Sequence, residues 1–198
     1  MPNSTWTTST DLLHDLKAST AEGWERFVHL YTPLIYSWCR KAGLQEADSA
    51  DVCQEVFRDV SRGIHKLQYD QPSHSFRGWL WTITRGAIGR HFRKLATAPV
   101  ATGGSNSLRQ LGEVPDWINN DQVPESGRAE AEVMRRAAEL IKDDFEEHTW
   151  QAFWLSAVED LPAADIGERL GMTKNAVRQA KFRVMNRLRE FVGFDGQS

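Results

Sequence analysis

The stretch that most constrains how this chain can fold covers residues 163–184 and reads AADIGERLGMTKNAVRQAKFRV. Apolar residues recur at helical spacing on both sides of Gly171, a residue that allows a sharp turn. Thr173 can cap the second helix, because its hydroxyl can accept hydrogen bonds from exposed backbone N–H groups. The small residue expected in the first helix is Gly167. Together these features predict a helix-turn-helix.

The second helix of this motif has two faces on a helical wheel. Apolar side chains form one face, namely Val177, Ala180, Val184, Leu188 and Phe191. Residues 174–189 contain six basic residues and no acid. Arginine and glutamine can pair with guanine and adenine edges, and phenylalanine can contact a thymine methyl group. An amphipathic surface helix with solvated cations is the alternative. The pattern favours double-stranded DNA contacts by Lys174, Asn175, Arg178, Gln179, Phe182, Arg183 and Asn186.

The rest of the chain is predicted to be helical, in two parts. Apolar residues recur at three- and four-residue steps from Trp24 to Trp38, Gly43 is a stop signal, and Asp48 or Ser49 can cap the next helix. Residues 76–95 form a third helix that is apolar almost all round. Residues 96–130, with ATGGSNS at 101–107, have a linker composition. We therefore expect an all-α fold, with helical domains over 1–95 and 131–198 joined by a flexible linker.

Composition excludes several classes of protein. The two cysteines lack the spacing of a metal site, and no apolar run approaches the ~18 residues of a membrane span. The N-terminus lacks the pattern of a secretory signal. The six histidines form no HxxxH or HExxH pair, and Gly103–Gly104 lacks the lysine of a phosphate loop. We expect a cytoplasmic protein with free thiols, without membrane insertion, enzymatic activity, cofactor or metal.

Four stretches in order resemble a bacterial sigma-70-type factor of the extracytoplasmic-function class. They are WERFVHLY at 24–31, DVCQEVF at 51–57, SFRGWLWTITRGAIGRHFR at 75–93, and residues 160–189. The resemblance covers roughly residues 11–95 and 131–192, and the sequence of these stretches is most similar to planctomycete-type members. It implies a protein that binds core RNA polymerase and directs it to a promoter. The first domain would then read and melt the −10 element, and the helix-turn-helix would read the −35 element.

The resemblance also implies roles for individual residues. The polar face that docks on core RNA polymerase would consist of Asp51, Gln54, Glu55 and Arg58. The loop at 68–76 would capture a flipped base. Contacts with −10 DNA would come from His74, Arg77, Trp81, Arg85, Arg90, Arg93 and Lys94. Of the two tryptophans on this helix, Trp79 is expected in the core, whereas Trp81 either packs in the core or stacks on an unpaired base.

Two positions depart from the family pattern. Gly86 stands where the family commonly has Asn, and Arg90 stands where it commonly has Asp. Glycine has no side chain that could hydrogen-bond a base, whereas arginine could add a phosphate contact. We therefore expect unusual or relaxed recognition of the −10 element.

A second function class is a free-standing helix-turn-helix regulator with a sensing or dimerising N-terminal module. A DNA-binding protein that acts alone usually needs several phosphate contacts. This chain has a net charge of −3, and residues 143–168 contain eight acids and no Lys or Arg. That balance favours a subunit that a large partner delivers to DNA.

Control by an anti-sigma factor is common in the extracytoplasmic-function class. The linker acts either as a spacer or, through its acids, as a mimic of nucleic acid.

Overall fold

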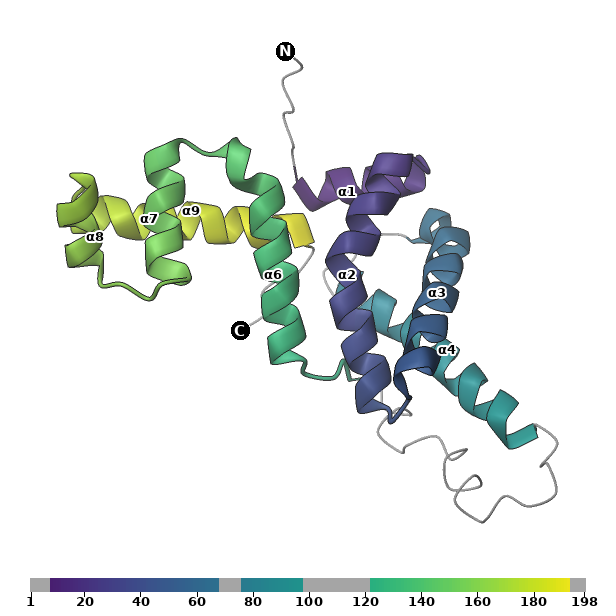
Figure 1. Ribbon diagram of the computed structural model, residues 1–198. Coiled ribbons are helices and arrows are strands. Elements are labelled where there is room, and N and C mark those ends of the chain that lie inside the picture. The colour runs from purple at the N-terminus through teal and green to yellow at the C-terminus, as the bar shows by residue number, and fades with distance from the viewer. Residues whose placement is uncertain (1–7, 68–75, 98–121, 193–198) are drawn as a thin grey trace. The chain divides into compact units, whose positions relative to one another are not determined.

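The computed structural model describes residues 8–67, 76–97 and 122–192 (Figure 1). Within these ranges all regular structure is helical, which confirms the predicted all-α class. The α-helices are α1 (Thr8–Lys17), α2 (Ala21–Lys41), α3 (Glu46–Gly63), α4 (Phe76–Thr97), α6 (Gly127–Ile141), α7 (Glu147–Ala157), α8 (Ala163–Leu170) and α9 (Lys174–Val192). Short 3-10 helices follow α3 and α6, namely η1 (Ile64–Lys66) and η3 (Lys142–Asp144). None of the helices in the described ranges is long and apolar enough to cross a membrane.

Two compact units account for the tertiary contacts. Among the described residues, one unit lies within Asp15–Val133, and the other combines Thr8–His14 with Met134–Val192. Most of the predicted linker, residues 98–121, lies outside the described residues. Its last residues are described, and from Gly127 they form the first turn of α6.

The unit Asp15–Val133 is built around α2, α3 and α4, which pack on one another. Aromatic side chains fill its centre: the rings of Trp38 and Trp81 meet edge to face with centroids 5.3 Å apart. Phe76, at the start of α4, packs against Phe27 and Tyr31 of α2. These contacts fix α4 against α2 through bulky, buried apolar surface.

The helix ends in this unit agree only partly with the sequence signals. Gly43 has φ 88° just beyond α2, as the predicted stop requires. The predicted cap of α3 by Asp48 or Ser49 is wrong, because α3 begins at Glu46 after Gln45. Ser49 lies inside the first turn, where its hydroxyl donates to the Gln45 carbonyl at 2.7 Å.

Both thiols are buried in this unit. Cys39 on α2 is 0% exposed and Cys53 on α3 is 5% exposed, and both are free cysteines. The hydrogen bond with Cys53 and burial together raise the pKa of Cys39. A protonated, buried thiol is a weak nucleophile, so Cys39 belongs to the packing of α2 on α3. The hydrogen bond with Cys39 lowers the pKa of Cys53, although burial opposes this shift.

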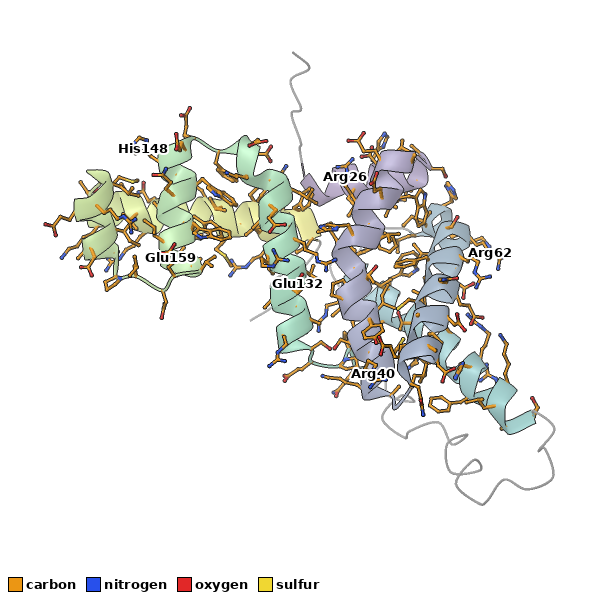
Figure 2. The ribbon with its side chains drawn as sticks, in the orientation of Figure 1. Arg26, Arg40, Arg62, Glu132, His148 and Glu159 are labelled. Atoms are coloured by element: carbon orange, nitrogen blue, oxygen red, sulfur yellow. The ribbon has the colours of Figure 1, made fainter. Side chains whose placement is uncertain are left out.

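In the other unit, α7 and α8 pack on α9 (Figure 1). A buried cluster joins the three helices, and it consists of Ala152, Leu155, Ile166, Val177 and Ala180. Exposed acids lie at both ends of α7, with Glu147 in its first turn and Glu159 just beyond its last; Figure 2 shows Glu159 at the opposite end of α7 from His148.

Candidate nucleic-acid and polymerase interfaces

The turn between α8 and α9 depends on two glycines. Gly171 ends α8 with φ 66°, a left-handed conformation that favours glycine. Gly167 lies under the turn, where a β-carbon would be 2.5 Å from the Met172 carbonyl oxygen. The Met172 N–H donates to the Gly167 carbonyl at 2.8 Å, so the two backbones are held at this distance. Glycine at 167 therefore permits the close approach of turn and helix.

The start of α9 is capped as the sequence predicts. The Thr173 hydroxyl accepts a hydrogen bond from the Ala176 N–H at 3.1 Å. The apolar face of α9 is also confirmed, because all of its predicted members are buried: Val177, Ala180, Val184, Leu188 and Phe191. The opposite face of α9 is thereby fixed outward.

That outward face carries the residues predicted to contact DNA. The exposed members are Lys174, Asn175, Arg178, Gln179, Phe182 and Arg183, and Asn186 is half-buried. Phe182 is 64% exposed although it is a large apolar side chain. Packing within the unit does not account for an aromatic ring in water beside Arg178 and Gln179. A ring at this place is suited to an apolar contact with a base.

Two other cations of α9 are used within the unit. Lys181 donates to the Ser156 carbonyl at the end of α7, at 3.2 Å. Arg187 donates from Nε and Nη2 to Oδ2 of Asp144, at 3.2 and 3.0 Å, and lies over the ring of Phe191. Only some of the basic residues counted in the sequence therefore belong to the outward face.

The predicted −10 residues of α4 are found in different environments. Arg93 and Lys94 are exposed near its end, and Arg85 is half-buried. Arg77, in its first turn, donates to the Glu130 carboxylate and to the Pro124 carbonyl. His74 lies outside the described residues, as does most of the loop at 68–76.

The two tryptophans of α4 differ in burial, and the expectation for Trp79 is wrong whereas Trp81 takes one of its two predicted placements. Trp81 is 1% exposed and packs against Trp38, so its ring cannot reach an unpaired base in this conformation. Trp79, which was expected in the core, is half-buried beside Phe76. Because α4 is apolar almost all round, its sequence pattern does not identify the buried face. Trp81 therefore packs in the core, the alternative to base stacking that the sequence left open.

Arg90 connects α4 to α3. Its Nε donates to the Glu55 carboxylate at 3.0 Å, and its Nη2 pairs with Asp59. Burial lowers the pKa of Arg90, but the hydrogen bond with Glu55 and the nearby charge of Asp59 outweigh it, so the pKa is raised. Arg90 therefore stays charged and is engaged by two acids. A phosphate contact by Arg90 would have to replace them.

The predicted polymerase-binding residues all lie on α3. Asp51, Gln54 and Arg58 are exposed, whereas Glu55 is half-buried in its ion pair with Arg90. Arg58 donates from Nε to the Gln54 carbonyl one turn earlier, at 3.3 Å. Of the four predicted residues, Asp51, Gln54 and Arg58 are therefore the ones whose side chains are exposed.

A capped helix-turn-helix with a polar outward face places the chain among DNA-binding proteins. Comparison with family models identifies the family: residues 27–97 match Sigma-70 region 2, and residues 148–188 match Sigma-70, region 4. No curated protein matches the chain. The chain belongs to the sigma-70 family, as a factor of its extracytoplasmic-function class, and directs promoter-specific transcription. These domains imply interaction with core RNA polymerase and promoter DNA, and sigma factors as a family are not enzymes.

Proposed function

We propose that α9 reads the −35 element and that α4, with the loop before it, reads the −10 element. The observation that carries the first assignment is the outward face of α9, where Arg178, Gln179 and Phe182 are exposed together. Arginine and glutamine supply hydrogen bonds to base edges, and the phenyl ring supplies a contact for a thymine methyl. Lys174 and Arg183 contact phosphates, and Asn175 and Asn186 complete the face.

At the −10 element, the exposed cations Arg93 and Lys94 hold the strand backbones, together with Arg85. Arg77 and Arg90 join them when their acidic partners are displaced. His74, in the capture loop, adds a phosphate contact. Phosphate contacts of this kind set the register of the protein on DNA, whereas base contacts give specificity.

The polymerase-binding role belongs to Asp51, Gln54 and Arg58 on the exposed side of α3. Glu55 contributes to it while also holding Arg90. We keep residues 1–95 and 131–198 as the two working modules and 96–130 as their connection, whose last residues, 122–130, belong to the same compact unit as α2, α3 and α4. A planctomycete-type origin stays a prediction.

The chemistry of transcription belongs to the polymerase, so we expect no enzymatic activity, cofactor or metal in this chain. We place the protein in the cytoplasm, where bacterial polymerase and promoter DNA are found. An anti-sigma factor is a further partner that the resemblance implies.

Transcript sequencing with purified core polymerase, with and without the full chain, tests the proposal that this chain directs the polymerase to promoters. New start sites should share two upstream elements at fixed spacing; unchanged start sites would refute it.

Gly86→Asn is expected to sharpen base preference at the −10 element by about fivefold or more, because it restores an amide that can hydrogen-bond a base. A β-carbon at this position would lie 3.5 Å from Nη1 of Arg90, an ordinary contact, so the backbone of α4 accepts a side chain here. Transcription from promoters randomised at −10 measures the preference. Gly86→Ala is the matched control, since it adds the β-carbon without the amide. Identical preferences in the two variants would contradict the expectation.

A further inference from the structure

Residues 122–133 lie outside both ranges that match the family models, yet they belong to the same compact unit as α2, α3 and α4. The Pro124 carbonyl accepts hydrogen bonds from two helices. Trp38 of α2 donates from Nε1 at 3.4 Å, and Arg77 of α4 donates from Nη2 at 3.1 Å. A single backbone oxygen therefore fixes this segment to α2 and α4.

Glu130 supplies the second attachment. Its Oε1 accepts from Nη2 of Arg77 and, at 2.8 Å, from the Ser126 N–H. The Glu130 N–H in turn donates to the Ser126 carbonyl at 2.8 Å. Ser126, Ala129 and Val133 are buried, with 4%, 9% and 0% exposure. The carboxylate is thus held in place by its own turn of helix, and pairing with Arg77 costs little further ordering.

The ion pair between Glu130 and Arg77 competes with the proposed contact between Arg77 and a DNA phosphate. A guanidinium recognises carboxylates and phosphates with the same donors, so one group excludes the other. The two paired side chains are 24% and 28% exposed, so a competing anion can approach them. Residues 122–130, which we call the latch, place a carboxylate where the proposed function places a DNA phosphate.

We propose that the latch is an internal competitor of promoter DNA: Glu130 occupies Arg77 in the free protein and is displaced when Arg77 takes a phosphate of the −10 strand. The inference rests on the proposed DNA-binding role of Arg77. It assigns to the segment before the helix-turn-helix domain a function that the two matched regions do not contain. The free energy needed to displace the latch weakens −10 binding by the free chain and makes that binding depend on a well-placed phosphate.

Glu130→Gln tests the latch in the full chain without RNA polymerase, the state in which Glu130 pairs with Arg77. Glutamine keeps an acceptor for the Ser126 N–H but removes the charge that pairs with Arg77. Glu125→Gln is the matched control, because Glu125 is an exposed acid of the same segment. With forked DNA carrying a single-stranded −10 element, Glu130→Gln should bind about fivefold more tightly than Glu125→Gln. Arg77→Ala should weaken DNA binding. When it is added to both Glu130→Gln and Glu125→Gln, the two affinities should become equal.

Amide hydrogen exchange gives a second readout. Residues 126–133 of the wild-type protein should exchange faster when forked promoter DNA is added, and Glu130→Gln should raise their exchange without DNA. Suppose that Arg77→Ala weakens DNA binding, but Glu130→Gln and Glu125→Gln bind with equal affinity and DNA does not change the exchange of residues 126–133. That result would overturn the latch and leave the proposed role of Arg77 intact. If Arg77→Ala leaves DNA affinity unchanged, the proposed role of Arg77 fails, and the latch fails with it.

Discussion

Gly167→Ala is expected to lower the free energy of unfolding of the α7–α9 unit by about 2–3 kcal/mol, as overpacking of a tight contact does. The new methyl group would lie 2.5 Å from the Met172 carbonyl oxygen, well inside van der Waals contact. That oxygen belongs to the backbone of the turn and cannot swing aside like a flexible side chain. Alanine would add about 1 kcal/mol of helix propensity, which is too little to offset the clash.

Thermal and urea unfolding followed by circular dichroism measure this loss. Gly127→Ala is the matched control, because a β-carbon at Gly127 has nothing within 4 Å. We expect the control to change stability by about 0.5 kcal/mol or less. Equal unfolding curves for the two variants would show that the turn can relax around a methyl group, and that Gly167 is not required by the geometry.

Arg178→Ala is expected to weaken binding to the −35 element by about tenfold to a hundredfold, the usual worth of a bidentate base contact. Arg178 is exposed at the centre of the outward face of α9. Lys181→Ala is the matched control: it removes the same charge from the same helix, but Lys181 donates to the Ser156 carbonyl. If both variants weaken binding equally for specific and unrelated DNA, α9 binds by charge alone.

Phe182→Ala extends this test to the apolar contact. Replacing thymine by uracil removes only the methyl group from DNA. We expect one such replacement in the −35 element to weaken binding of the wild-type protein and to leave binding of Phe182→Ala unchanged. An equal effect on both proteins would place the ring away from the bases, despite its 64% exposure.

The helix-turn-helix could be predicted from the sequence because its determinants are local. The Thr173 cap, the Gly171 turn and the two faces of α9 depend on residues within one or two turns of each other, and the structure has all of them. The fold class followed from helical periodicity for the same reason. The cap of α3 was the local exception, since Ser49 lies in its first turn instead.

The remaining features of the site depend on contacts between residues distant in sequence. Arg77 and Glu130 are 53 residues apart, and Arg90 pairs with Asp59 across 31 residues, so neither pairing leaves a local pattern. The burial of Trp81 depends on Trp38 of another helix. The basic residues in the sequence therefore identify a basic helix, but they do not show which of its arginines pair with acids of the same chain.

The most direct test of the account is co-elution of the full chain with core RNA polymerase on gel filtration. The test variant is Gln54→Ala/Arg58→Ala, which spares Glu55 and its ion pair with Arg90. Arg135→Ala, at an exposed arginine of α6, is the control. We expect the wild-type protein and the control to elute with the polymerase and the double variant to elute alone. Failure of the wild-type protein to co-elute would contradict the sigma-factor account, and full retention of the double variant would contradict the placement of its docking face on α3.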